Sequence, residues 1–96
     1  QETSLRVFEQ LQSMCSCPIT LIRLGRNSRK WNSGVQASPY RDRVFHFEYL
    51  SRKDMVRMYN AVDCLLFPSW YEGFGWPPVE AMACGTPVVV SDRASL

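Results

Sequence analysis

Glycines and glutamates gather in one short stretch, residues 68–80 of the 96-residue chain. Gly73 and Gly75 lie just before an expected helix, so the backbone there can approach a ligand closely. The N-terminus of that helix adds unpaired amides and a partial positive charge directed at the same point. Together these features predict an anion site, and phosphate is the usual ligand of such a site.

Two carboxylates flank the predicted anion site. Glu72 precedes the glycines, and Glu80 lies within the expected helix, with seven residues between the two glutamates. Carboxylates repel phosphate, but they accept hydrogen bonds from hydroxyl groups. A nucleotide sugar carries hydroxyls on both sides of its diphosphate. We therefore expect Glu80 to bind the ribose diol and Glu72 to bind a hydroxyl of the sugar.

Each of these features also has a purely structural explanation. A glutamate early in a helix can simply complement the helix dipole, and a Gly-x-Gly sequence can be only a turn. Aromatic residues can pack the loop against the sheet, namely Trp70, Tyr71, Phe74 and Trp76. The occurrence of all these features in one strand–loop–helix unit favours the ligand site.

The run from Tyr59 to Asp92 resembles the C-terminal domain of glycosyltransferase family 4, which has the GT-B fold. The signature of that family is two glutamates separated by seven residues, with a continuation like the one found here at 81–89, Ala-Met-Ala-Cys-Gly-Thr-Pro-Val-Val. Asp63 and the sequence Phe-Pro-Ser at 67–69 fit the same pattern. Because both ends also look cut, we expect an internal piece of the donor-binding domain, without the acceptor domain.

The resemblance implies a retaining glycosyltransferase that uses a nucleoside diphosphate sugar and requires no metal or further cofactor. Neither glutamate would be a nucleophile, and the leaving diphosphate would help to deprotonate the acceptor. Catalysis would then consist of positioning and charge stabilisation. The implied catalytic residue is Glu72, in contact with the transferred sugar. The implied donor-binding residues are Glu80 at the ribose, the amides of Gly73, Phe74 and Gly75 at the sugar and diphosphate, and the backbone at Leu50 near the base.

Two departures from the family pattern stand out. The family's Arg and Lys for the diphosphate are not assigned in this chain, and we expect Arg23, Arg26 and Lys30 to belong to a solvated loop. Trp76 stands where an aliphatic residue is commoner. A non-catalytic nucleotide-binding or interaction module of the same fold therefore stays as an alternative. A sugar-nucleotide epimerase of GT-B fold is a further alternative, against which the spaced glutamate pair argues.

The elements that position these residues alternate between helix and strand. This order predicts an α/β fold with a Rossmann-like parallel sheet and flanking helices, in one partial domain over residues 1–96. Ligands then bind beyond the carboxyl ends of the strands. The expected helices cover 3–15, 51–62 with Ser51 as N-cap, and 77–84 with Gly85 as left-handed cap. The expected strands cover 19–24, 44–49, 63–67 and 87–91, and a long surface connection with at most a helical turn covers 26–41.

The composition limits the possible partners. A hydrophobic content of 46%, a charged content of 21% and a net charge of +2 are typical of a globular protein and give no reason to expect nucleic-acid binding. No apolar run is long enough to span a bilayer. The four cysteines lack zinc-site spacing, so we expect free thiols in a reducing cytoplasm, with Cys64 and Cys84 buried. Any membrane association would come from the missing domain, and the acceptor, whether glycan, lipid or small molecule, is left open.

Overall fold

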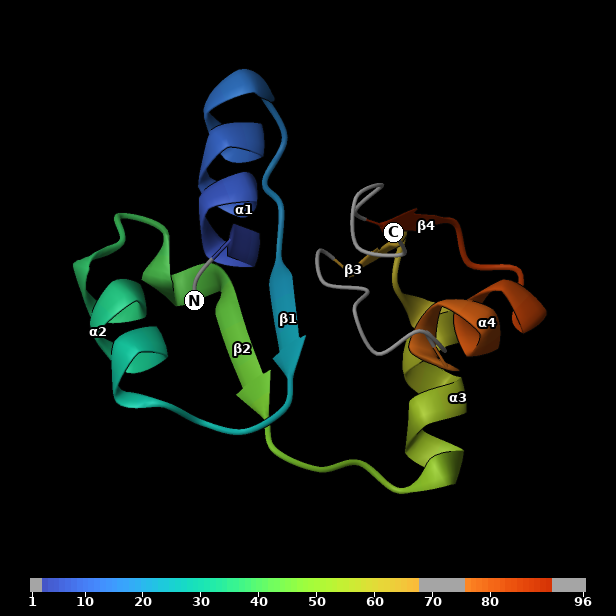
Figure 1. The fold of residues 1–96 in the computed structure, drawn as a ribbon. Helices are drawn as coiled ribbons and strands as arrows, with labels where there is room; N and C mark the ends of the chain where they lie inside the picture. Colours follow the sequence, from blue (N-terminus) through green and yellow to red (C-terminus); the bar gives the residue numbers. More distant parts are fainter. Residues whose placement is uncertain (1–2, 68–75, 91–96) are drawn as a thin grey trace, which may run out of the picture. The chain divides into compact units, whose positions relative to one another are not determined.

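The computed structural model describes residues 3–67 and 76–90, which are coloured in Figure 1. The chain divides into two compact units, Gln1–Tyr49 and Leu50–Leu96. The N-terminal unit contains α1 (Thr3–Met14), β1 (Leu21–Leu24), α2 (Arg29–Ala37), the short 3-10 helix η1 (Arg41–Arg43) and β2 (Val44–Phe47). The C-terminal unit contains α3 (Arg52–Ala61), β3 (Leu65–Phe67), α4 (Trp76–Ala83) and β4 (Val88–Val90).

The N-terminal unit is built on a parallel pair of strands. β1 and β2 run in register from Leu21 opposite Val44 to Leu24 opposite Phe47, and α2 lies in the connection between them. Gly25 follows β1 with φ of 144°, and its amide donates to the Phe47 carbonyl at 3.0 Å. The pair is therefore a strand–helix–strand unit, as the alternating sequence pattern predicts.

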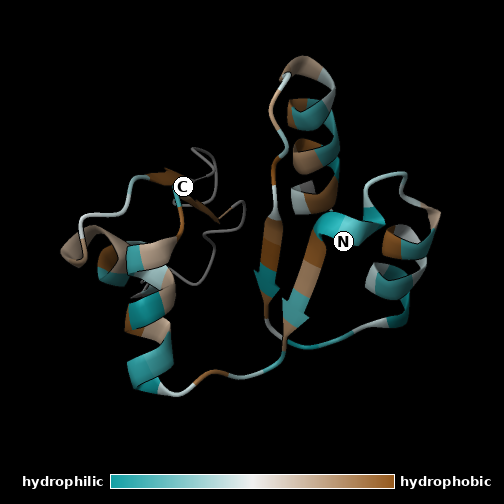
Figure 2. Cartoon of the chain, turned by 180° about the vertical axis from the view of Figure 1, so that it is seen from behind, coloured by the Kyte–Doolittle hydropathy of each residue, from teal (hydrophilic) through white to brown (hydrophobic). Residues whose placement is uncertain are grey.

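One face of this strand pair is covered by the helices. The buried core consists of Leu5 and Phe8 from α1 and Trp31 from α2, and Leu21 and Val44 of the strands pack against it. Because side chains alternate along a strand, the other face carries the remaining apolar residues of both strands. These residues are Ile22, Leu24, Phe45 and Phe47, each 37–51% exposed. Figure 2 shows brown, hydrophobic segments along both strands.

The helix α2 corrects the expectation of a long surface connection over residues 26–41. Ser28 is its N-cap, with the hydroxyl accepting a hydrogen bond from the Trp31 amide at 3.0 Å. Trp31 is only 2% exposed, and Val35, one turn later, packs against the same core. Trp31 is the buried residue of α2, so its large indole is the main contact of this helix with the core.

The C-terminal unit repeats the strand–helix–strand order. β3 and β4 are parallel, with Leu65 opposite Val88, and the Leu65 amide also bonds to the Pro87 carbonyl at 2.9 Å. The helix α4 lies between them in the chain and contacts both strands. The helices α3 and α4 lie next to one another (Figure 1). Among the described residues of this unit, the buried ones are Tyr59, Pro78, Ala81 and Thr86.

A glycine cap ends α4 as predicted. Gly85 has φ of 83°, the left-handed conformation that favours glycine. The Thr86 amide donates to the Ala81 carbonyl, and the Gly85 amide donates to the Met82 carbonyl, each at 2.9 Å. These two bonds define a Schellman motif, which pairs carbonyls that the helix end would otherwise leave open. The motif fixes the direction in which the chain leaves α4 toward β4.

The α/β class and the parallel pairing of the strands are confirmed. The hydrogen-bonded strands of the described residues form two two-stranded sheets, β1–β2 and β3–β4. The strands are shorter than predicted, since β1 begins at Leu21 and β3 at Leu65. The residues directly before β1 and β3, Thr20 and Cys64, are exposed and lie outside the hydrogen-bonded segments.

The cysteines are free thiols, but the expectation of burial is wrong for Cys64. Cys64 is exposed at the entrance to β3, and Cys84 is half-buried after the end of α4. Within 3–67 and 76–90, no group of three or more His, Cys, Asp or Glu side chains is placed to hold a metal ion. No helix in the same residues has the length and apolar character to cross a membrane.

Candidate functional site

Helices α3 and α4 form a pocket of about 180 Å³ within the C-terminal unit. Four lining residues share one face of α3 because they recur at helical spacing, and three come from α4 and its end. Arg52 and Glu80 supply the charged groups of the lining, and the rest is largely apolar. The lining residues are Arg52, Met55, Val56 and Tyr59 from α3, with Glu80, Ala83 and Cys84.

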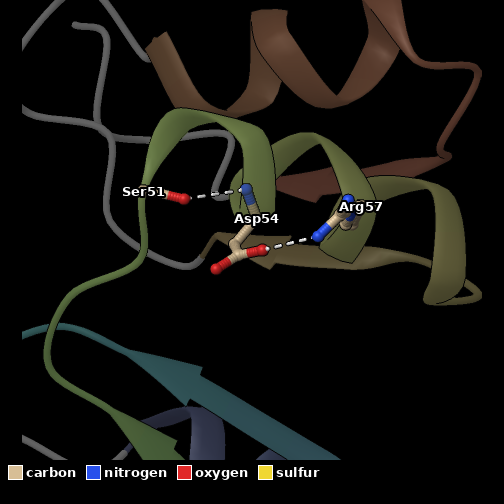
Figure 3. Close-up of polar contacts among 3 residues, drawn as sticks. All are labelled: Ser51, Asp54 and Arg57. Atoms are coloured by element: carbon tan, nitrogen blue, oxygen red, sulfur yellow. Dashed lines mark hydrogen bonds and ion pairs between the residues drawn. The ribbon is translucent and has the colours of Figure 1, made fainter.

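The start of α3 is fixed by its predicted cap (Figure 3). The Ser51 hydroxyl accepts a hydrogen bond from the Asp54 amide at 3.1 Å. The Asp54 carboxylate in turn accepts a bond from Arg57 at 3.2 Å, in an exposed pair that contributes little to stability. Leu50, predicted to lie near the base, directly precedes this cap and is half-buried. The cap therefore sets the path of the backbone at Leu50 relative to the first turn of α3.

Glu80 is held by a tyrosine of the neighbouring helix. The Tyr59 hydroxyl donates a hydrogen bond to Oε1 of Glu80 at 3.2 Å. Tyr59 is only 4% exposed. Burial, followed by the hydrogen bond to Glu80 and the nearby charges of Glu80 and Cys84, together raise the pKa of Tyr59 to about 12. The hydroxyl is therefore protonated at neutral pH and is a constant hydrogen-bond donor to the carboxylate.

The backbone of Tyr59 is tied to the end of α4 as well. The Thr86 hydroxyl donates to the Tyr59 carbonyl, and Thr86 is 5% exposed. Tyr59 is thus attached to α4 by its side chain at Glu80 and by its main chain at Thr86. Two attachments at opposite ends of one residue fix the spacing of α3 and α4, and with it the place of Glu80 in the pocket.

This arrangement suits recognition of a ligand that carries hydroxyl groups. An ionised carboxylate only accepts hydrogen bonds, and it has room for several on its two oxygens. Tyr59 occupies Oε1, and among the described residues no other hydrogen bond or ion pair is formed by the Glu80 side chain. Glu80 can therefore accept bonds from a diol, while Met55, Val56 and Ala83 give the pocket apolar walls for a flat or aliphatic group.

The structure places only part of the predicted site. Glu80 and Leu50 both lie in the C-terminal unit, and Glu80 lines the pocket. The other predicted residues fall outside the described residues, and so does the glycine segment of the predicted anion site. These are Glu72, Gly73, Phe74 and Gly75. Their roles, and those of Glu80 and Leu50, stay predictions.

Tyr59 is not among the site residues that the sequence predicts. A buried tyrosine needs a partner for its hydroxyl, and this requirement was the available signal. Arg52 was also missed, since it lies at the first turn of α3 in a run of mixed charges.

Three basic residues of the N-terminal unit, Arg23, Arg26 and Lys30, were predicted to lie in a solvated loop. Arg23 lies in β1, not in a solvated loop, and its guanidinium carbon is 4.5 Å from the centroid of the Trp31 ring. Its Nη1 donates to the Arg26 carbonyl at 2.9 Å and lies 3.2 Å from Nδ1 of His46. Arg26 is exposed between β1 and α2, as expected of a solvated loop, whereas Lys30 is exposed in the first turn of α2 and the loop assignment is wrong for it. Arg23 is therefore a packing residue of this unit.

Comparison with known proteins extends over nearly the entire chain. The family model described as "Glycosyl transferases group 1" matches residues 2–96. The O-antigen chain mannosyltransferase B of Escherichia coli is 48% identical over 53 residues, which are 55% of this chain and 14% of that protein. The D-inositol 3-phosphate glycosyltransferase of Mycobacterium sp. (strain KMS) is 50% identical over 50 residues, 52% of this chain and 11% of that protein.

A third relative shows the same kind of similarity. The serotype-specific mannosyltransferase WbdA of Escherichia coli is 39% identical over 56 residues, 58% of this chain and 7% of that protein. The aligned segments therefore span 7–14% of the length of these curated relatives. No solved structure matched the chain.

Proposed function

Because the chain belongs to the glycosyl transferases of group 1, we propose that it is part of the sugar-donor-binding half of a retaining, family 4 glycosyltransferase. The reaction is transfer of a sugar from a nucleoside diphosphate sugar to an acceptor. The observation that carries this proposal is Glu80, which lines a pocket between α3 and α4 with one carboxylate oxygen bound by Tyr59. A carboxylate so held suits the ribose hydroxyls of the donor.

The remaining roles are those that the family resemblance implies. Glu72 contacts a hydroxyl of the transferred sugar, and the amides of Gly73, Phe74 and Gly75 face the sugar and diphosphate. The nucleoside lies in the pocket, with the backbone at Leu50 near the base. The apolar lining of the pocket supports this assignment, because a base or ribose offers flat or aliphatic surface to such walls.

Catalysis in this proposal depends on positioning. Neither glutamate forms a covalent intermediate, and the leaving diphosphate assists deprotonation of the acceptor on the same face of the sugar. The protein holds the donor in reactive geometry and stabilises the charge that develops on the sugar. The relatives include a mannosyltransferase and a D-inositol 3-phosphate glycosyltransferase, so several sugars and acceptors are compared in the test.

The test is sugar transfer and donor hydrolysis by the complete transferase with a panel of UDP-, GDP- and ADP-sugars. We expect turnover with one nucleotide, weaker donor binding in Glu80→Gln and lower turnover in Glu72→Ala. NMR of the product should show that the anomeric configuration of the donor is retained. Absence of turnover with every donor, in a folded protein offered several acceptors, would contradict the proposal and favour the non-catalytic module.

A further inference from the structure

The C-terminal unit contains a buried tyrosine, Tyr59, to which the proposed function assigns no role. Tyr59 is the buried residue of α3, and its hydroxyl points to the carboxylate of Glu80 on α4. A tyrosine that served only as packing could be a phenylalanine. The hydroxyl is therefore the part of Tyr59 that needs a function.

The hydroxyl constrains one oxygen of Glu80. It donates to Oε1 at 3.2 Å, and a glutamate side chain without such a partner would be free to rotate about its terminal bond. Fixing Oε1 also fixes the direction of Oε2. An oriented carboxylate binds a diol more tightly than a mobile one, because less side-chain freedom is lost on binding.

The position of Tyr59 is itself determined by the fold. Its ring is buried between the helices, and its carbonyl accepts a bond from the buried Thr86, which follows the glycine cap of α4. The side chain of Tyr59 therefore approaches Glu80 from a backbone that α4 holds in place. This linkage transmits the geometry of the two helices to a single carboxylate.

We propose that Tyr59 is a positioning residue, which orients the Glu80 carboxylate so that Oε2 receives the ribose hydroxyls of the sugar donor. This inference rests on the proposed function, since it assumes that Glu80 binds ribose. Tyr59 itself does not touch the donor. It acts on discrimination between nucleotides with and without ribose hydroxyls, and not on the diphosphate or the base.

The experiment measures this discrimination directly in the complete transferase. Calorimetry gives the Kd of uridine, guanosine and adenosine diphosphates and of their 2′-deoxy and 3′-deoxy forms. For the preferred base, wild type should bind the ribonucleotide roughly tenfold or more tightly than the deoxy forms, because a hydrogen bond to a charged group is lost. In Tyr59→Phe this ratio should fall to roughly threefold or less, because the ribonucleotide loses more affinity than the deoxy forms, which make fewer bonds to Glu80.

Two further variants separate the possible outcomes. Tyr40→Phe is the matched control, since Tyr40 is a half-buried tyrosine of the N-terminal unit whose hydroxyl forms no hydrogen bond with the described residues, and its ratio should equal that of wild type. In Glu80→Gln the ratio should fall, and adding Tyr59→Phe should lower it no further. A wild-type ratio in Tyr59→Phe together with a reduced ratio in Glu80→Gln would overturn the positioning role alone. A wild-type ratio in Glu80→Gln would overturn the proposed ribose contact itself.

A second substitution keeps the inference testable if Tyr59→Phe does not fold. A difluorotyrosine at position 59 keeps the ring and the hydroxyl but lowers the pKa of that hydroxyl. The discrimination ratio should then begin to fall at a lower pH than in the unmodified protein, because a phenolate cannot donate to Glu80. The same pH dependence in both proteins would overturn the inference.

Discussion

The side-chain hydroxyl of Thr86 donates a hydrogen bond to the backbone carbonyl of Tyr59, joining two buried residues that are 27 positions apart. Thr86 follows the glycine cap of α4, and Tyr59 lies in the last part of α3. The bond therefore connects the ends of two helices that share the pocket. It links the stability of the C-terminal unit to the placement of Glu80.

Removing this hydroxyl should loosen both helix ends. Thr86→Val has nearly the same shape but leaves the buried Tyr59 carbonyl without its side-chain partner, at a cost of about 1–3 kcal/mol. Hydrogen exchange of the α3 and α4 amides in the complete transferase measures the local opening free energy. Thr86→Ser keeps the hydroxyl, so its α3 and α4 amides should lose less protection than those of Thr86→Val. Equal protection in the two variants would show that the bond contributes nothing.

The cap at Gly85 should tolerate only glycine without cost. A Cβ at this position would meet no atom within 4 Å, so any penalty comes from the backbone φ of 83° and not from crowding. Gly85→Ala should reduce stability by about 1 kcal/mol, and Gly85→Asn by less, because asparagine adopts the left-handed conformation more readily. Urea unfolding of the variants checks this order. An alanine variant as stable as wild type would mean that the cap relaxes at no cost.

Arg23 should affect stability and not donor binding. Its guanidinium lies over the Trp31 ring and bonds to the Arg26 carbonyl, an arrangement in which a cation–π contact contributes about 0.5–2 kcal/mol. Arg23→Gln should lower the unfolding midpoint and leave the donor Kd unchanged. Arg26→Gln, at an exposed residue, is the control for loss of charge alone. A larger donor Kd in Arg23→Gln, with an unchanged unfolding midpoint, would instead assign Arg23 to the diphosphate.

The raised pKa of Tyr59 predicts a specific loss of stability at alkaline pH. The folded state holds this proton up to a pKa of about 12, whereas the unfolded chain releases it near 10.0. The native state thus binds more protons over that interval, so the stabilisation is complete below pH 10 and is lost as the pH rises through 12. Between pH 9 and pH 12, the thermal unfolding midpoint (Tm) should fall more steeply for wild type than for Tyr59→Phe. Parallel curves would contradict the raised pKa.

Much of the fold could be predicted from the sequence because its signals are local. Ser51 as N-cap, Gly85 as left-handed cap and the alternating order of helix and strand each depend on a few neighbouring residues. The helix α2 was missed for the opposite reason. Its start at Ser28 is a local signal, but its stability comes from Trp31, which is buried against residues distant in the sequence.

The candidate site shows the same division. The spacing of Glu72 and Glu80 is visible in the sequence, and so is the family to which the chain belongs. The contact of Tyr59 with Glu80 spans 21 positions and depends on how α3 packs against α4. A sequence pattern indicates which face of α3 is apolar, but it does not give the direction of a hydroxyl on that face. The packing of Arg23 could not be predicted for the same reason, because its partner Trp31 lies on another element.

A crystal structure of the complete transferase with its nucleoside diphosphate bound tests the central claim most directly. We predict that the ribose 2′- and 3′-hydroxyls lie within hydrogen-bond distance of Glu80, with the Tyr59 hydroxyl still on the other carboxylate oxygen. A nucleotide bound elsewhere, or one whose ribose faces away from Glu80, would contradict the account.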